Sequence, residues 1–126
     1  MLIIAQVYII ICSSRIIVKI IRENNSKGIL CFVAISEIYV VIESFAAIYS
    51  ILYFFNNNAI HNVNNASAWT IYLDMLYFST VTFTTLGYGD LVPNNSATKI
   101  FVILEVFFFV VALSFAVVNL VRRKED

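Results

Sequence analysis

The sequence predicts an all-α membrane protein in which two spanning helices enclose a short re-entrant helix and a glycine-containing loop. The first observation is composition: 61% of the 126 residues are hydrophobic and only 13% are charged, whereas about a quarter of the residues in a soluble domain are charged. The second is arrangement, because the apolar residues fall in long blocks. The third is that two of the three glycines, Gly87 and Gly89, lie within three residues of each other.

The two spanning helices are predicted over residues 29–55 and 99–121. Each has the roughly 20 residues that are needed to cross a bilayer. An additional N-terminal helix is expected within residues 1–27, where the apolar run contains Arg15 and Lys19. It either crosses the bilayer, with both basic side chains snorkelling to one interface, or lies flat on that interface. A cleaved signal peptide is disfavoured because no basic stretch precedes the apolar run and no small-x-small site follows it.

The segment between the two spans begins with an Asn-rich stretch, residues 56–67, which is predicted to be a polar surface loop. Residues 68–83 are apolar but too few to span comfortably, and Ser67 is suited to cap a short helix there. Irregular backbone at membrane depth is tolerated only when it is buried in protein or lines a water-filled path. A short helix followed by a glycine loop therefore predicts a re-entrant segment.

Basic residues predict the orientation. Seven of the eight Lys and Arg residues fall in two clusters, residues 15–27 and the short tail 122–126. If both predicted spans cross the bilayer, the clusters lie on one side, and the positive-inside rule makes that side cytoplasmic. We expect an integral protein of the plasma membrane, with a cytoplasmic C-terminus and an outward-facing glycine loop.

Composition also excludes several functions. The formal net charge is zero, so no nucleic-acid partner is expected. The two cysteines, Cys12 and Cys31, lie in apolar blocks and indicate neither a disulfide framework nor a metal site. No enzymatic step is expected.

The stretch "VTFTTLGYGDLVP", residues 81–93, suggests a specific chemistry. An ion that crosses hydrocarbon must exchange its hydration shell for other oxygens, and neutral backbone carbonyls can supply them. Consecutive carbonyls face one axis only if the backbone alternates between right- and left-handed conformations, and glycine adopts the left-handed one readily. Gly87 and Gly89 stand where such a loop needs them. One loop supplies one side of a cage, so several copies must surround the axis.

At these residues the chain resembles a known family. "TTLGYGD", residues 84–90, is similar to the selectivity-filter signature of potassium channels, with Leu86 where Val or Ile is more usual. The wider run 74–93 resembles the pore loop of small two-transmembrane potassium channels of prokaryotic or viral type. The resemblance implies a homotetramer around a central pore. Its pore domain, residues 28–121, would comprise an outer helix (29–55), an extracellular loop (56–67), a pore helix (68–83), a filter (84–90) and an inner helix (99–121).

The resemblance also implies the site. The filter would bind dehydrated potassium as the permeant ion, with no other cofactor. The partners would be other copies of the chain and membrane lipid. The implied filter residues are Thr85, Leu86, Gly87, Tyr88 and Gly89, with potassium at the carbonyls of the first four and at the Thr85 hydroxyl.

The residues expected to support the filter are Tyr77, Phe78, Val81, Thr84 and Asp90. The Tyr77 hydroxyl is expected to hydrogen-bond Asp90, and Tyr77 and Phe78 occupy the places of an aromatic pair that braces the filter tyrosine in the family. Val81 stands where some bacterial relatives carry a glutamate that binds the aspartate. Asp90 is therefore expected to be held less firmly, and inactivation of the filter to differ from that of those relatives.

Acidic and basic residues within the apolar blocks have two interpretations each. Glu105 is expected to be a protonated or hydrogen-bonded structural residue, with a pore-helix hydroxyl such as that of Thr82 as partner; the alternative is a pH sensor. Arg15, Lys19 and Arg22 have the spacing of a basic helix stripe, which favours interface anchoring over a voltage sensor.

The inner helix contains no glycine, and Phe109 stands at about the position of the family's hinge. Apolar residues recur there at a spacing of three to four and are candidates for an inner-pore lining that gates by dewetting. They are Val110, Leu113, Val117 and Val121.

The expected function is that of a potassium channel pore subunit. The alternatives are a weakly selective cation channel and a non-conducting membrane subunit that partners a larger channel. The intact Gly87-Tyr88-Gly89 triplet argues against both, because relaxed relatives alter it and a silent subunit need not keep it.

Overall fold

The structure is a computed structural model that describes residues 27–122, with side chains described for residues 34–114. The additional helix predicted within residues 1–27 lies, apart from Lys27, outside the described residues, and so do Arg15, Lys19, Arg22 and the end of the tail.

Within residues 27–122, two helices are long and apolar enough to cross a membrane. α2 runs from Lys27 to Phe55, and α4 runs from Ser96 to Arg122. The candidate spans within them are Ala34–Phe55, with 22 residues, and Ser96–Ser114, with 19. Between them lies α3, a shorter helix from Ala68 to Phe83. The predicted arrangement of two membrane-length helices and a short middle helix is confirmed.

The described chain divides into two compact units at residue 44, within α2. In the first unit, Glu37 and Glu43 are half-buried, and the Ser44 hydroxyl donates a 2.7 Å hydrogen bond to the Val40 carbonyl one turn earlier. The second unit, residues 45–126, holds the predicted site.

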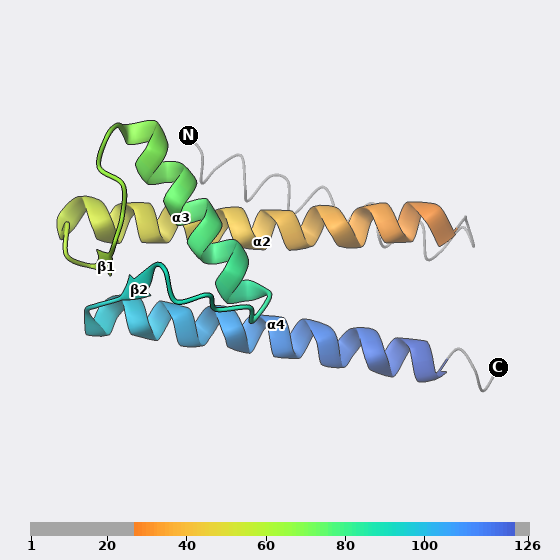
Figure 1. The fold of residues 1–126 in the computed structure, drawn as a ribbon. Coiled ribbons are helices and arrows are strands. Elements are labelled where there is room, and N and C mark those ends of the chain that lie inside the picture. Colours follow the sequence, from red (N-terminus) through yellow and green to blue (C-terminus); the bar gives the residue numbers. More distant parts are fainter. Residues whose placement is uncertain (1–26, 123–126) are drawn as a thin grey trace. The chain divides into compact units, whose positions relative to one another are not determined.

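Two very short strands lie in the second unit (Figure 1). β1 is Ile60–His61 and β2 is Val92–Pro93; they pair antiparallel, with Ile60 opposite Pro93 and His61 opposite Val92. The sequence contains no signal for these strands, because two residues are too few to produce the alternation that marks a strand. The pair joins the Asn-rich loop to the segment that follows the glycines.

α4 begins at Ser96, three residues before its predicted start at residue 99. The reason is a cap: the Thr98 amide donates a 2.7 Å hydrogen bond to Oδ1 of Asn95, which satisfies an amide that the first turn would leave without a partner. The prediction followed the apolar run, and the polar first turn does not belong to that run.

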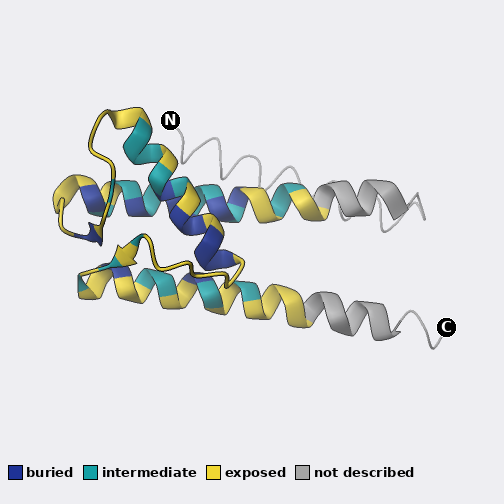
Figure 2. Ribbon diagram, in the orientation of Figure 1, coloured by how far each residue is buried: buried dark blue, intermediate teal, exposed yellow. Residues whose placement is uncertain are grey.

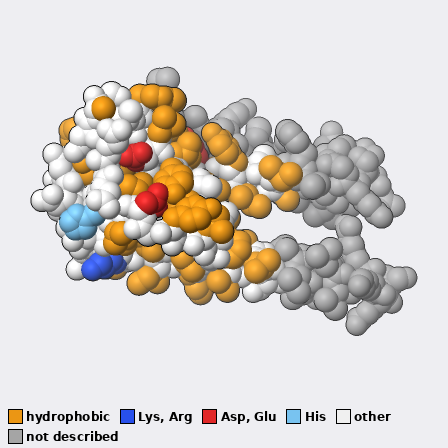
Figure 3. All heavy atoms as spheres, in the orientation of Figure 1, with side chains coloured by type: hydrophobic (Ala, Val, Ile, Leu, Met, Phe, Trp, Pro, Cys, Tyr) orange, Lys and Arg blue, Asp and Glu red, His pale blue; other side chains and the backbone are white. Residues whose placement is uncertain are grey.

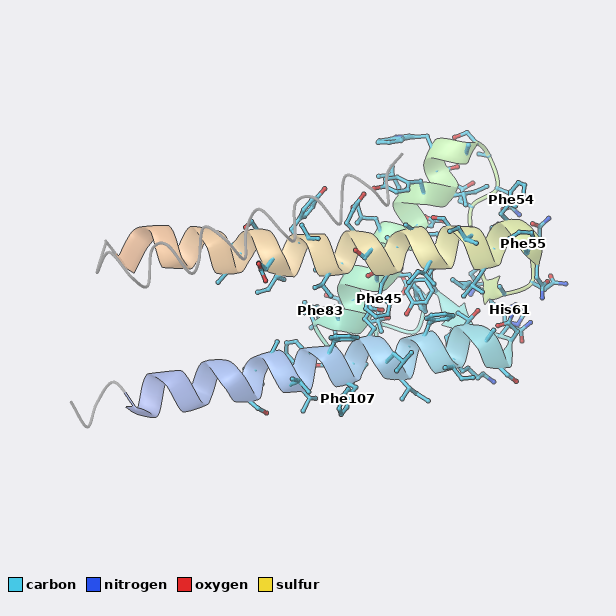
Figure 4. All side chains as sticks on the ribbon, turned by 180° about the vertical axis from the view of Figure 1, so that it is seen from behind. Phe45, Phe54, Phe55, His61, Phe83 and Phe107 are labelled. Atoms are coloured by element: carbon cyan, nitrogen blue, oxygen red, sulfur yellow. The ribbon has the colours of Figure 1, made fainter. Side chains whose placement is uncertain are left out.

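The core of the second unit forms where α3 meets its neighbours, and the buried part of α3 lies in its second half (Figure 2). Phe45 and Phe83 point into the space between helices, while Phe107 points away from it (Figure 4). The Phe45 ring contacts Phe108 at a centroid distance of 6.1 Å, and Phe83 contacts Phe109 at 5.3 Å. Edge-on aromatic contacts of this kind stabilise a core beyond the area they bury.

The surface of α4 that faces away from the core is also apolar, and Figure 3 shows hydrophobic side chains exposed along α4. The most exposed are Ile103, Phe107 and Ile100, at 67%, 62% and 56%. A helix that is apolar all round belongs in lipid or against other protein rather than in water. This surface fits the assignment of α4 as a membrane-spanning helix.

Candidate functional site

The site begins at a fixed helix start. The Ser67 hydroxyl accepts a 3.2 Å hydrogen bond from the Thr70 amide, and the Thr70 hydroxyl accepts one of 2.9 Å from the Ser67 amide. This reciprocal pair is a capping box, which satisfies two amides at once and sets the first residue of the helix. The prediction that Ser67 caps α3 is confirmed.

The other end of α3 holds the glycine loop. The Val81 carbonyl accepts hydrogen bonds from the amides of Leu86 and Gly87, at 2.9 and 3.2 Å. The Thr82 carbonyl accepts one from the Thr85 amide at 3.0 Å. Three amides of the loop therefore point at the carboxyl end of α3, where the helix dipole places partial negative charge.

The backbone of the loop alternates between two conformations. Thr85, Gly87 and Gly89 have φ values of 59°, 51° and 78°, while Leu86 and Tyr88 do not have positive φ. An added Cβ at either glycine would meet no atom within 4 Å in one chain. Glycine is thus needed at these two positions for its left-handed conformation and not for space.

Thr85 is the member of this series that sequence reasoning missed. A positive φ is unusual for any residue with a Cβ and is an outlier for a β-branched one, with a cost on the order of 1–3 kcal/mol. The hydrogen bond from the Thr85 amide to the Thr82 carbonyl helps to hold it. The sequence did contain a signal for a left-handed Thr85. Thr85 is two residues before Gly87 and four before Gly89, so a conformation that alternates every two residues includes it.

The carbonyl oxygens of the loop remain available. Within the described chain, none of the carbonyls of residues 85–89 accepts a hydrogen bond, while their neighbours at both ends of the loop do take part in hydrogen bonds. Residues 84–90 are all exposed in one chain. The loop therefore offers a run of free carbonyl oxygens in a backbone conformation that repeats every two residues.

The outer end of the loop is tied to α3 by the predicted hydrogen bond. The Tyr77 hydroxyl donates to Oδ2 of Asp90 at 2.6 Å. This bond is the main cause that lowers the pKa of the Asp90 carboxyl, and it raises the pKa of Tyr77 to about 12. Asp90 is thus ionised, and Tyr77 is thus protonated, over the ordinary range of pH.

Asp90 is also held from the Asn-rich loop. Nδ2 of Asn62 donates a 2.9 Å hydrogen bond to the Asp90 carbonyl, and Asn62 itself adopts a left-handed backbone with φ of 66°. Asparagine tolerates this conformation better than most residues. The sequence assigned this stretch to a polar surface loop, and no signal in it pointed to a contact 28 residues away.

Further asparagine contacts make the loop an organised support. The Asn94 amide donates to the Ala59 carbonyl at 2.9 Å, and Nδ2 of Asn94 donates to the Asn58 carbonyl at 3.0 Å. The Asn64 amide donates to Oδ2 of Asp74 in α3 at 2.7 Å. These bonds connect the loop both to the segment after the glycines and to the first half of α3.

The remaining predicted support residues lie in two environments. Phe78 and Val81 are buried, at 3% and 6% exposure, and the Phe78 ring meets Tyr49 edge-on at 4.9 Å. Thr84 is exposed, and its hydroxyl donates to the Thr80 carbonyl at 2.7 Å. Phe78 thus packs on α2 in one chain, so a bracing of Tyr88 by Phe78 stays a prediction.

Glu105 is fully buried, and the prediction that it is hydrogen-bonded to a hydroxyl of the pore helix is confirmed. The residue named for that role, Thr82, was wrong. The carboxylate oxygens of Glu105 accept hydrogen bonds from Tyr49 in α2 and Ser79 in α3, at 2.7 and 2.5 Å. Ser79 lies nearly one turn before Thr82 on α3, so the two hydroxyls present different heights to α4. Sequence reasoning could not find Tyr49, which is 56 residues away along the chain.

The structure describes the side chains of only two of the four predicted inner-pore residues. Val110 and Leu113 are half exposed, at 50% and 52%. Val117 and Val121 lie in α4, outside the residues whose side chains are described. A pore lining by these four residues stays a prediction.

A free-carbonyl loop between two membrane-length helices is the arrangement of an ion channel pore. Residues 29–125 match the family described as "Ion channel", Ion_trans_2, and the chain belongs to this family. Because the match covers most of the chain, it includes α3, the glycine loop and α4. Membership of this family agrees with the expectation that no enzymatic step takes place.

Individual relatives match shorter segments. The chain is 63% identical over 35 residues to "Two pore potassium channel a" of Oryza sativa subsp. japonica, which is 28% of this chain and 10% of the rice protein. It is 33% identical over 63 residues to "Potassium channel protein kcv" of Paramecium bursaria Chlorella virus 1, which is 48% of this chain and 64% of the viral protein.

An archaeal relative is similar over a comparable stretch. The chain is 43% identical over 42 residues to the "Hyperpolarization-activated voltage-gated potassium channel" of Methanocaldococcus jannaschii, which is 33% of this chain and 20% of that protein. The chain thus spans only a small part of the plant and archaeal relatives and just under two thirds of the viral one.

Proposed function

We propose that this chain is the pore subunit of a homotetrameric, potassium-selective channel. The observation that carries the proposal is the alternation of positive φ at Thr85, Gly87 and Gly89, combined with free carbonyls along the same residues. The rice and viral relatives are both named as potassium channels, which supports potassium as the permeant ion.

Conduction follows from ligand exchange. The carbonyls of Thr85, Leu86, Gly87 and Tyr88 replace the hydration shell of potassium, and the Thr85 hydroxyl adds an oxygen at the inner end. The carboxyl end of α3 contributes partial negative charge beside the same loop. Carbonyls do not titrate, so the binding of the ion requires no change of protonation.

Exposed aromatic and apolar side chains near the loop support a symmetric assembly. Tyr88 is 67% exposed and Leu86 59% in one chain. One loop supplies ligands from one side of an axis only, so further copies are needed to surround an ion. Burial of these side chains against neighbouring copies would offset the loss of freedom on assembly.

Aromatic residues at one end of the second unit support its position at a membrane interface. Phe54 and Phe55 are both 81% exposed at the end of α2, and Trp69 is exposed in the first turn of α3. Aromatic belts mark the membrane–water interface. The positive-inside rule puts the basic C-terminal residues 122–124 in the cytoplasm, so we place this aromatic end outside the cell, in the plasma membrane.

Flux measurements test the proposal. The full chain is reconstituted in liposomes with an outward potassium gradient, and potassium and sodium fluxes are compared with and without barium. The proposal predicts that the potassium flux is much larger than the sodium flux. It also predicts that barium blocks the potassium flux. Comparable sodium flux would point to a weakly selective cation channel. An assembled protein without flux would indicate a non-conducting subunit.

A further inference from the structure

One carboxyl group connects three helices of the second unit. Glu105 in α4 has no exposed surface, as do Tyr49 in α2 and Ser79 in α3. The Tyr49 hydroxyl donates to Oε2 of Glu105 at 2.7 Å, and the Ser79 hydroxyl donates to Oε1 at 2.5 Å. Each carboxylate oxygen therefore serves a different helix.

This carboxyl depends on its two donors. Among the described residues Glu105 forms no ion pair, so hydrogen bonds alone compensate for its removal from solvent. Removal of one donor would leave a buried acceptor without a partner, and such an acceptor is costly in a buried site. The two bonds therefore constrain the distance from α4 to each of the other helices.

The Ser79 bond lies close to the glycine loop. Ser79 is two residues before Val81, and both are in the buried second half of α3. The Val81 carbonyl in turn accepts the amides of Leu86 and Gly87. A continuous path of hydrogen bonds and helical backbone thus runs from Glu105 through the last turns of α3 to the loop.

We propose that Glu105 is a positioning residue for the filter. Through Ser79 it fixes the carboxyl end of α3 against α4, and thereby fixes the backbone conformation of residues 85–89. The Tyr49 bond orients the carboxyl group but does not lie on the path to the filter. The role in conduction rests on the proposed function, while the effect on loop conformation does not.

Variants of the two donors separate positioning from general stabilisation. Ser79→Ala removes the bond between Glu105 and α3. Tyr49→Phe removes only the bond to α2 and keeps the ring that meets Phe78 at 4.9 Å. Glu105→Gln replaces one of the two acceptor oxygens with an amide NH2 group, which cannot accept a hydrogen bond from a hydroxyl donor. Thr98→Val is the matched control, because the Thr98 hydroxyl is also buried in α4 but has no hydrogen-bond partner among the described residues.

The measurement is hydrogen exchange of the amides of residues 84–90 in the full chain, reconstituted in lipid nanodiscs. Ser79→Ala and Glu105→Gln are expected to exchange roughly fivefold faster there than the wild type, the effect of losing one net hydrogen bond. The double variant is expected to exchange no faster than Glu105→Gln alone, because both changes break the same link. Tyr49→Phe and Thr98→Val are expected to match the wild type in this segment.

Two results would overturn the proposal. One is wild-type exchange of residues 84–90 in Ser79→Ala. The other is an equal acceleration in Tyr49→Phe and Ser79→Ala, which would make Glu105 a general stabiliser. If Ser79→Ala does not assemble, Glu105→Gln and Tyr49→Phe decide the question, and Ser79→Thr, which keeps the hydroxyl, is expected to exchange as the wild type does.

Ion permeability gives a second readout. The ratio of rubidium to potassium permeability is expected to change in Ser79→Ala and to stay unchanged in Tyr49→Phe. Because exchange is measured without ion flux, a wild-type chain that conducts nothing would refute the proposed function and leave the exchange test decisive for Glu105.

Discussion

The Tyr77 hydroxyl donates a 2.6 Å hydrogen bond to Oδ2 of Asp90, and this bond ties the middle of α3 to the outer end of the glycine loop. The inner end of the same loop is held by the Val81 carbonyl, which accepts two loop amides. The loop is therefore fixed at both ends by one helix, and its conformation depends on where that helix lies.

Loss of the Tyr77 bond is expected to weaken the outer end of the loop. Tyr77→Phe removes the hydroxyl and keeps the ring, so Asp90 loses its link to α3. It retains the hydrogen bond from the Leu91 amide to its Oδ1 and the one from Asn62 to its carbonyl. Potassium current through the variant is expected to decay faster at constant voltage. Tyr39→Phe, an exposed tyrosine in the first unit, is the control and is expected to match the wild type. Equal decay times in Tyr77→Phe and wild type would contradict the prediction.

The effect of the Tyr77–Asp90 bond on current decay is expected to be independent of pH over a wide range. The pKa of Asp90 is lowered, so the contribution of the bond is fully present above the ordinary value of 3.8 and is lost as the pH falls through the lowered pKa. The pKa of Tyr77 is raised to about 12, so the bond persists until the solution becomes strongly alkaline. From about pH 5 to about pH 9, the difference in current decay between wild type and Tyr77→Phe is expected to stay constant. The prediction would be contradicted if the decay time of the wild-type current changed with a midpoint between about pH 5 and about pH 9 and the decay time of Tyr77→Phe did not.

Gly87→Ala is expected to abolish potassium conduction while leaving assembly largely intact. At φ of 51° alanine is strained by about 1 kcal/mol, although its Cβ meets no atom within 4 Å in the chain. The strain favours a backbone rotation that turns a carbonyl away from the axis. Liposome flux and native mass spectrometry measure the two properties. Gly28→Ala, in the first turn of α2, is the control, and selective potassium flux from Gly87→Ala would refute the filter assignment.

Ser67→Ala is expected to destabilise the start of α3. The change removes one half of the capping box and costs about 1 kcal/mol. The amides of residues 68–71 should then exchange roughly fivefold faster, while those of residues 84–90 are unchanged. Asn57→Ala, an exposed residue of the preceding loop, is the control. Unchanged exchange at the start of α3 would show that the cap is dispensable.

Substitutions of Asn62 separate a hydrogen bond from a backbone preference. Asn62→Gly keeps the left-handed conformation and loses the bond to the Asp90 carbonyl, whereas Asn62→Ala loses both. Exchange of the Leu91 and Val92 amides is expected to rise in the glycine variant and to rise further in the alanine variant. The prediction would fail if the two variants behaved alike, because the φ of 66° would then carry no cost.

The sequence by itself determined the parts of the fold that depend on local properties. The lengths of the apolar blocks produced the two membrane-length helices, since about 20 apolar residues are needed to cross a bilayer. Ser67 marked the start of α3, because a cap depends on residues within one turn. The two glycines in "LGYG" marked the loop, because the left-handed conformation is a property of the single residue.

Only the tertiary structure decided the contacts between distant segments. Asn62 with Asp90, and Glu105 with Tyr49 and Ser79, join residues 26 to 56 positions apart. A hydroxyl or an amide side chain can pair with many groups, and its own position in the sequence does not select among them. The left-handed Thr85 has the same origin: its conformation is unfavourable for the isolated residue and is held by α3, whose carboxyl-terminal carbonyls bind the amides of the loop.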